Sequence, residues 1–181
     1  AAVERGGVAL TRRGRGEAQV AADGHLQLTR GAVVEHFHNG EEGVEQSWAF
    51  ATQPEGEGAL RVRIEPRGMR YVGETDSGLH FADASGLGFR YGHGLWRDAR
   101  GHETAVPVRW VRGAIELHVP AAVLDESVYP AVLDPVISPE VGADEPVEVA
   151  APGNQSVPSV AWDGSQYFVA WADSRNGGST D

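Results

Sequence analysis

Two histidines, His36 and His38, stand two residues apart in the run Glu35-His36-Phe37-His38. Alternate residues of a β-strand face the same side, so both imidazoles are expected on one face of a strand. Glu42 follows His38 four positions later, which completes the spacing H-x-H-x3-E. Imidazole and carboxylate groups together are ligands for transition metals. The pattern allows a metal site formed by His36, His38 and Glu42, and its default interpretation is two surface histidines near a strand end.

The same spacing resembles the first metal-binding motif of the cupins, and Pro66-Arg67-Gly68 resembles the P-x-G of their second motif. The resemblance implies a metal-dependent enzyme in which the two histidines and the glutamate hold the metal. Two positions depart from the family pattern. Tyr71 occupies the place of the third metal-binding histidine, and Arg30 occupies the place of a glycine six residues before the first histidine. The cupin-like enzyme is therefore the alternative hypothesis.

Other side chains with catalytic potential have simpler structural interpretations. His93, His102 and Glu103 border a glycine-rich stretch that could supply metal ligands, but such stretches also form wherever a chain turns. Asp76-Ser77-Gly78 has the D-S-G order of aspartic proteases, which need two such loops so that two carboxylates share a proton. The sequence contains one copy, so we predict a turn. The G-x-S-x-G, Walker and dinucleotide-binding motifs are missing from the sequence.

The end of the chain is rich in oxygen-bearing side chains. Asp173, Asn176 and Asp181 could contribute to a Ca²⁺ site, but the run lacks the regular acidic spacing and closing glutamate of an EF-hand loop. A hydrogen-bonded turn is the favoured interpretation, and calcium is the alternative. The many carboxylates also allow a glycosidase, which would need two of them placed across a cleft.

The charge of the chain narrows the classes of partner. All 15 basic residues are arginine, and 26 acidic residues bring the net charge to −11. An acidic surface repels phosphate groups, so nucleic acid and anionic membranes are poor candidates. No apolar run approaches the roughly 20 residues of a membrane-spanning helix, so we expect no transmembrane segment. The chain has no cysteine, which excludes disulfides, thiolate zinc sites and cysteine nucleophiles.

Alternation of apolar and polar residues dominates the sequence and predicts strands with one buried face. The pattern is clearest in Leu60–Ile64 and Ile115–Val119. Glycine-containing pairs such as Asp23-Gly24 and Arg112-Gly113 separate the alternating rows and suit tight turns. Residues 5–137 therefore predict an all-β fold, an antiparallel β-sandwich or jelly-roll-like domain.

The alternation also assigns each side chain to a face. The residues expected in the core are Leu60, Val62, Ile64, Val108, Trp110, Ile115, Leu117 and Val119. The residues expected in solvent are Arg61, Arg63, Glu116 and His118. Residues Ala121–Glu126 are the one stretch expected to form a helical turn.

The composition changes after residue 137. Residues 138–157 are acidic and include three of the ten prolines, which suits an extended linker. Residues 158–181 hold two apolar rows around Asp163-Gly164-Ser165 and predict a β-hairpin, either part of a propeller blade or an assembly segment. An isolated hairpin is marginal in water, so we expect its apolar side chains to make assembly contacts. These side chains are Trp162, Tyr167, Phe168, Val169 and Trp171.

Two segments resemble parts of exported bacterial surface proteins that are best known from myxobacteria. The first covers roughly residues 30–137. It begins with Val34–Gln46, includes Gly94–Gly101 and closes with Tyr129–Pro135, which has the order Y-P-x-x-x-D-P. The second, Ser156–Gly177, resembles half a blade of the β-propeller repeats that follow this module in such proteins.

The resemblance implies export and a scaffolding or adhesive context, and it carries no catalytic activity over to this chain. The small residues Ala1-Ala2-Val3 are also what a cleaved signal peptide leaves behind. We therefore expect a non-catalytic, secreted or cell-surface bacterial module. Its expected partners are proteins, cell-surface components or further copies of itself. No cofactor is expected, with Ca²⁺ near Asp173, Asn176 and Asp181 as the alternative.

Overall fold

The chain is described by a computed structural model that covers residues 1–12, 16–22, 24–40, 43–84, 87–141, 155–162 and 167–173. It divides into two compact units, Ala1–Val141 and Gly142–Asp181. Strands account for 63% of the structure and helix for 4%, and the sheets are antiparallel. The predicted all-β class is confirmed.

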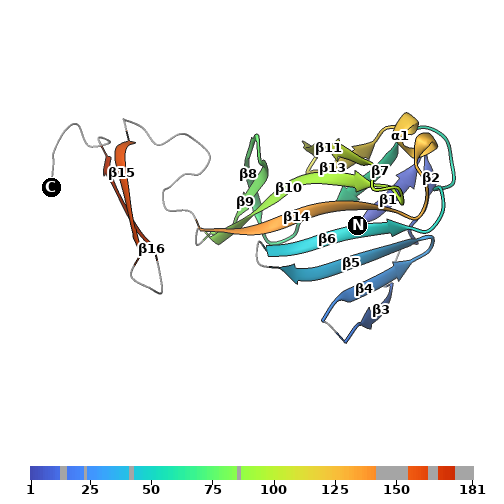
Figure 1. Ribbon diagram of the computed structural model, residues 1–181, viewed down its shortest axis with the longest axis horizontal. Coiled ribbons are helices and arrows are strands. Elements are labelled where there is room, and N and C mark those ends of the chain that lie inside the picture. Colours follow the sequence, from blue (N-terminus) through green and yellow to red (C-terminus); the bar gives the residue numbers. More distant parts are fainter. Residues whose placement is uncertain are drawn as a thin grey trace. The chain divides into compact units, whose positions relative to one another are not determined.

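The larger sheet of the first unit has the strand order β3-β4-β5-β6-β14-β10-β9-β8, and β11 pairs with β10 (Figure 1). Its strands are β3 (Glu17–Val20), β4 (Leu26–Arg30), β5 (Val33–Gly40), β6 (Gly43–Phe50), β8 (Arg70–Thr75), β9 (Gly78–Ala82), β10 (Leu87–Arg97), β11 (Glu103–Val106) and β14 (Ala131–Val141). The last strand of the unit, β14, lies between β6 and β10 and pairs antiparallel with both. Segments far apart in the sequence therefore meet at the centre of this sheet.

The smaller sheet has the strand order β12-β13-β7-β1-β2. Its strands are β1 (Ala2–Arg5), β2 (Val8–Ala9), β7 (Leu60–Ile64), β12 (Val108–Val111) and β13 (Ala114–Val119). Two-residue turns close two of its hairpins, at Gly6-Gly7 and at Arg112-Gly113. All four turn residues have positive φ, as hairpin turns of this length require. The predicted turn at Arg112-Gly113 is confirmed.

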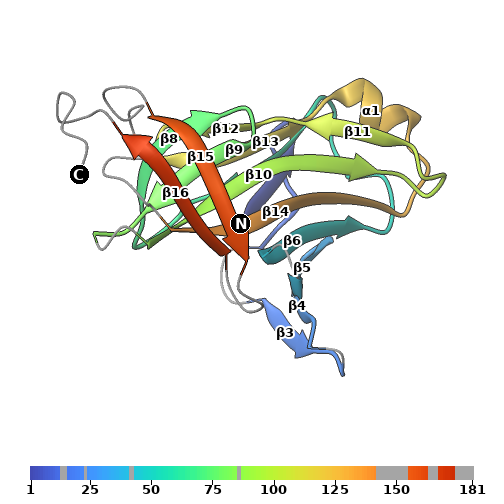
Figure 2. The same ribbon diagram turned by 60° about the vertical axis from the view of Figure 1, so that its left-hand side comes forward.

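Side chains from both sheets form one buried core, and Figure 2 shows the strands of both sheets from a second direction. Six of the eight predicted core residues are fully buried: Leu60, Val62, Val108, Ile115, Leu117 and Val119. Ile64 and Trp110 are partly buried at the border of the core. Trp110 packs there against Tyr71, with the ring centroids 4.8 Å apart. The alternation therefore identified the inward face of β7 and β13.

One of the residues predicted to face solvent is buried instead. Glu116 is only 4% exposed, whereas Arg61 and Arg63 are partly buried and His118 is exposed as expected. The prediction for Glu116 was wrong because long arginine side chains on the neighbouring strand cover the carboxylate. Alternation identifies the face of a sheet, but it does not show what lies over that face.

The glycine-rich stretch around His93, predicted as a turn, lies inside strand β10. The pairing of β10 with β14 shifts register between Tyr91 and Gly94, which marks a β-bulge. Gly94 itself faces the core, where an added Cβ would lie 3.0 Å from Leu133 Cδ1. The glycine therefore reflects close packing within a strand, which local sequence does not distinguish from a turn.

The predicted helical turn is present as α1 (Ala121–Glu126), which buries Leu124. The Tyr129–Pro130 peptide bond that follows it is cis and leads into β14. Across the described ranges, no helix has both the length and the apolar character needed to cross a membrane.

The second unit contains the predicted hairpin, formed by β15 (Gln155–Trp162) and β16 (Tyr167–Asp173). The strands are antiparallel, with Trp162 opposite Tyr167. Because β14 continues to Val141 and β15 begins at Gln155, both ends of the predicted linker 138–157 belong to strands. The middle of that linker, residues 142–154, lies outside the described residues.

Candidate functional site

Five titratable side chains lie on the outer face of the larger sheet, which is turned away from the core. We call them the imidazole–carboxyl row: His25, His36, His38, Glu45 and Asp134. His25 directly precedes β4, and the others belong to β5, β6 and β14. Gln46 and Leu133, which neighbour two of them in the chain, are buried on the opposite face. The alternation of the strands thus brings four segments of the chain to one row.

Contacts connect the row from β4 to β14. The ring centroids of His25 and His38 lie 3.9 Å apart. His38 stands opposite Glu45 in the pairing of β5 with β6, and its Nδ1 lies 3.9 Å from Glu45 Oε2. Glu45 in turn lies close enough to Asp134 for its charge and hydrogen bonding to raise the pKa of that carboxyl. His38 and Glu45 are 40% and 44% exposed, so solvent reaches the middle of the row.

Asp134 is the acid of the row whose ionisation is most disturbed. Burial raises the pKa of its carboxyl, the charge and hydrogen bond of Glu45 raise it further, and Arg97 lowers it in part, to about 6. Asp134 Oδ1 is buried and has no hydrogen-bond partner within the described ranges. With this raised pKa, the Asp134 carboxyl is protonated in mildly acidic solution.

The structure describes two of the three predicted metal ligands, His36 and His38. His36 and His38 share the outer face of β5, as their spacing predicts. Burial first, and then His25, lower the pKa of His36, which favours the neutral form that binds metals. Glu42 lies outside the described residues, and within the described part of the chain no three His, Asp or Glu side chains are grouped to hold a metal ion.

His93 connects three parts of the chain. Its Nδ1 accepts a hydrogen bond from the Val108 N–H at 3.2 Å, so Nε2 carries the hydrogen and donates to the Asp76 carbonyl at 3.0 Å. Asp76 and Ser77 form the turn of the β8–β9 hairpin, with Thr75 opposite Gly78. The turn predicted for the D-S-G sequence is confirmed.

His102 and Glu103 do not converge with His93. His102 donates its backbone N–H to Asp98 Oδ1 at 2.9 Å. Glu103 pairs with Arg97, whose Nε lies 2.8 Å from Glu103 Oε1. These hydrogen bonds and ion pairs connect neighbouring strands and turns. His93, His102 and Glu103 therefore do not form one site.

The predicted assembly residues all lie in the hairpin of the second unit. Trp162 ends β15, and β16 holds Tyr167, Phe168, Val169 and Trp171. Trp171 is 42% exposed. Of the residues considered for calcium, Asp173 ends β16, whereas Asn176 and Asp181 lie outside the described residues.

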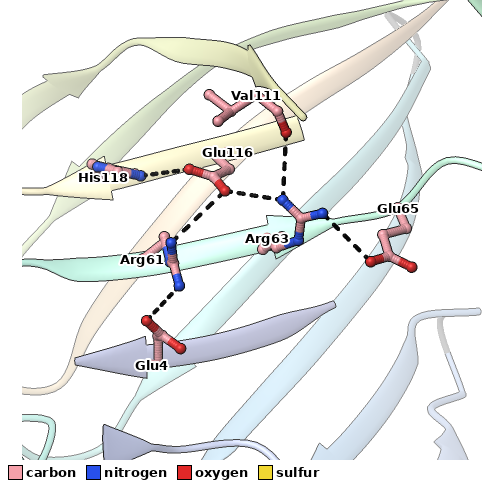
Figure 3. Close-up of polar contacts among 7 residues, drawn as sticks. All are labelled: Glu4, Arg61, Arg63, Glu65, Val111, Glu116 and His118. Carbon is pink, nitrogen blue, oxygen red and sulfur yellow. Dashed lines mark hydrogen bonds and ion pairs between the residues drawn. The ribbon is translucent and has the colours of Figure 1, made fainter. Parts of the chain in front are cut away.

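A second polar cluster, the Glu116 network, lies on the outer face of the smaller sheet (Figure 3). Glu116 Oε1 lies 3.1 Å from Arg63 and 3.9 Å from Arg61, and Oε2 lies 3.0 Å from His118 Nε2. Burial alone would raise the pKa of Glu116. The hydrogen bonds from His118 and Arg63 and the charge of Arg61 outweigh burial and lower that pKa. The cluster joins β7 to β13 across the face of the sheet.

Replacing Glu116 with glutamine is expected to lower the free energy of unfolding by about 1 kcal/mol at neutral pH. The loss is limited because both arginines remain partly in water. Since folding lowers the pKa of Glu116, the charge stabilises the fold above the ordinary carboxyl range and ceases to do so in acid. Urea unfolding should therefore separate the two proteins at neutral pH and bring them together in acid. Glu65→Gln, at a site 64% exposed, is the control and should change little at either pH.

Two hollows of the first unit lie apart from the residues predicted to do chemistry. A polar hollow of about 570 Å³ has charged walls supplied by Arg12, Glu17, Arg30 and Glu55. An apolar hollow of about 370 Å³ is lined in part by Val44, Met69, Phe89 and Ile137. Neither is lined by His36 or His38.

No protein-family model, curated protein or solved structure matches this chain. Its function must therefore be inferred from its own residues. The described polar clusters connect strands and turns to one another, and within the imidazole–carboxyl row the pKa of Asp134 is raised to about 6. Within the described residues, the β15–β16 hairpin of the second unit is a sheet of two strands.

Proposed function

We propose that the chain is a non-catalytic structural or adhesive module of an exported bacterial surface protein, and that it assembles through β contacts made by the β15–β16 hairpin. The observation that carries the proposal is this two-stranded sheet, to which no third strand is added within the described part of the chain. Three of its apolar side chains are well exposed: Val157 at 79%, Val160 at 61% and Trp171 at 42%. Unpaired strand edges beside apolar side chains favour association with further strands.

The two edges of the hairpin differ in their suitability for a partner. β15 contains Pro158, which has no N–H to donate, and Val157 beside it has a φ of 55°. The pairing of β15 is also irregular between Ser156 and Ser159. β16 (Tyr167–Asp173) contains neither proline nor glycine. Its free edge is therefore the better template for an added strand.

The core and the charge of the first unit are compatible with this proposal. Its two sheets share one core, consistent with a β-sandwich, and the buried Arg5 is hydrogen bonded to Pro54, Gly58 and Asp125. The net charge of −11 disfavours phosphate-rich ligands and leaves proteins, cell-surface components or further copies as the proposed partners.

Light scattering on the chain tests the assembly. We expect the wild type to form species heavier than the 19.3 kDa monomer, and the double variant Val160→Ser, Trp171→Ser to shift to the monomer mass. Leu87→Ser is the matched control, since Leu87 is 54% exposed on β10, and it should assemble like the wild type. Ending the chain after Val141, where β14 ends, should also give monomers. A wild type that stays monomeric at high concentration would contradict the proposal.

A further inference from the structure

Strand β3 (Glu17–Val20) forms one edge of the larger sheet, and in the described part of the chain it pairs only with β4. All four of its side chains are exposed. The strand contains no proline, and its pairing with β4 runs without a bulge. An edge strand of this kind leaves its outward N–H and C=O groups open to a further strand.

The apolar face of the larger sheet continues onto β3. The buried Trp48 of β6 stands opposite Glu35 of β5, which stands opposite Leu28 of β4. Leu28 in turn stands opposite Ala18. Because directly opposite residues point to the same side of a sheet, Ala18 and Val20 belong to the face that forms the core. Trp48 is 0% exposed and Val20 is 69% exposed, so the cover over this face ends before β3.

The other sheet edges of the first unit are short, irregular or occupied. β8 contains Gly73 and shifts register in its pairing with β9. β12 directly follows Pro107, and the Val108 N–H already donates to His93 Nδ1. β2 has two residues, and β11 ends in the buried Val106. Among the described strands of this unit, β3 is therefore the edge best suited to accept a further strand.

Strand β16 has the same two features, an open edge and an exposed apolar face. The assembly proposed above uses its edge, which contains neither proline nor glycine. Val160 of β15 stands opposite Val169 of β16, and alternate residues of a strand point to the same side, so Val160 and Trp171 share a face. Both of these side chains are well exposed. β16 and β3 therefore match in hydrogen-bonding groups and in the position of their apolar surface.

Charge also favours contact between these two strands. Residues 12–15, which lead into β3, hold three of the 15 arginines and no acid. Arg12 and Arg30 line the polar hollow at the start of β3, together with Glu17. Residues 155–173, which contain the hairpin, hold Asp163, Asp173 and no basic residue. In a chain with a net charge of −11, an acidic hairpin is attracted to this basic stretch of another copy more than to most of its surface.

We propose that β16 of one copy adds to the β3 edge of another copy, so that the core face of the larger sheet continues onto the added strand. This inference rests on the proposed function and names the surface that receives the hairpin. Trp171 of one copy then lies beside Ala18 and Val20 of the other and removes apolar surface from water. The two surfaces differ, so the contact is heterologous and produces open chains of copies when it repeats.

Variants of the full chain test the two surfaces separately. Val20→Lys places a charge on the β3 edge and removes the burial of the valine, so the concentration needed for assembly should rise at least about tenfold. The free energy of unfolding should not change, because Val20 is exposed. Val8→Lys is the matched control. It places the same charge at an exposed valine on β2, the edge strand of the smaller sheet, and should assemble like the wild type.

Mixing two variants restores the contact. Val20→Lys keeps the hairpin, and the double variant Val160→Ser, Trp171→Ser keeps the β3 edge. At a concentration where light scattering shows each of them alone as a monomer, an equimolar mixture should form dimers that grow no further. Assembly of Val20→Lys like the wild type, or a mixture that stays monomeric, would overturn the inference and leave the proposed function standing. A monomeric wild type would instead contradict the proposed function, and the inference with it.

Disulfide trapping locates the contact, because the chain has no cysteine of its own. Gln19 lies on the outer face of β3, and Ala170 and Ala172 lie on the face of β16 opposite to Trp171. An oxidised mixture of Gln19→Cys with Ala170→Cys or Ala172→Cys should give linked dimers that contain both variants. Gln27→Cys is the control, since Gln27 stands opposite Gln19 on β4, one strand further from the edge. Equal linking of Gln27→Cys, or none of Gln19→Cys, would overturn the contact.

Discussion

Replacing Gly78 with alanine is expected to lower the free energy of unfolding of the first unit by about 3 kcal/mol or more. Gly78 begins β9 directly after the Asp76-Ser77 turn and has a φ of +135°, which other residues rarely adopt. An added Cβ would also lie 2.2 Å from the carbonyl oxygen of Tyr91, a backbone atom that cannot rotate away. Strain and a steric clash therefore act at the same position.

Two other glycines separate these effects. Gly113 has a φ of +77° but open space around an added Cβ, so Gly113→Ala should cost about 1 kcal/mol. Gly73 has open space and no positive φ, so Gly73→Ala should cost nothing measurable. Urea unfolding of the three variants should give losses in the order 78, 113, 73. Equal losses of unfolding free energy for Gly78→Ala and Gly113→Ala would show that an added Cβ at position 78 does not clash with the Tyr91 carbonyl.

The strands and several turns could be predicted because they depend on local patterns. Leu60–Ile64 and Ile115–Val119 alternate strictly, and their apolar residues form the core. Arg112-Gly113 and Asp76-Ser77 are turns in the structure as the residue types predict. A pattern within five or six residues was sufficient in each case.

The polar clusters could not be predicted because they depend on strand pairing. Glu45 and Asp134 are far apart in the sequence and meet because β14 lies beside β6. Glu116 is buried because β7 brings two arginines over it. Sequence placed these carboxylates on strands, but the register between strands decides which ones meet. The spacing of His36 and His38 predicted their common face correctly and could not reveal their neighbours.

Replacing Asp98 with asparagine is expected to lower the melting temperature by roughly 5–10 °C at neutral pH. The Asp98 side chain is 1% exposed, and it accepts hydrogen bonds from three backbone N–H groups, those of Arg100, His102 and Val128. The Arg100 guanidinium also donates to it. Asparagine has one acceptor oxygen in place of two, so its NH₂ group would face N–H donors that then lack a partner.

The loss should depend on pH in a defined direction. Burial acts to raise the pKa of Asp98, but the hydrogen bonds from Val128, His102 and Arg100 outweigh it and lower the pKa to about 2. The carboxylate therefore stabilises the fold above the ordinary aspartate range, near pH 4, and its contribution disappears as the pH falls through about 2. Thermal unfolding of wild type and variant should differ most at neutral pH and converge in strong acid.

Arg100→Gln distinguishes the backbone hydrogen bonds of Asp98 from its ion pair. Arg100 is 58% exposed, so its charge interacts mainly with water and its loss should change the melting temperature much less than Asp98→Asn. The backbone donors matter more because one carboxylate joins the turn after β10 to Val128, the residue just before the Tyr129-Pro130 step into β14. Asp98, which lies within Gly94–Gly101, thus fixes through the Val128 N–H the position at which the Tyr129–Pro135 segment begins. A larger loss from Arg100→Gln than from Asp98→Asn would assign that role to the ion pair instead.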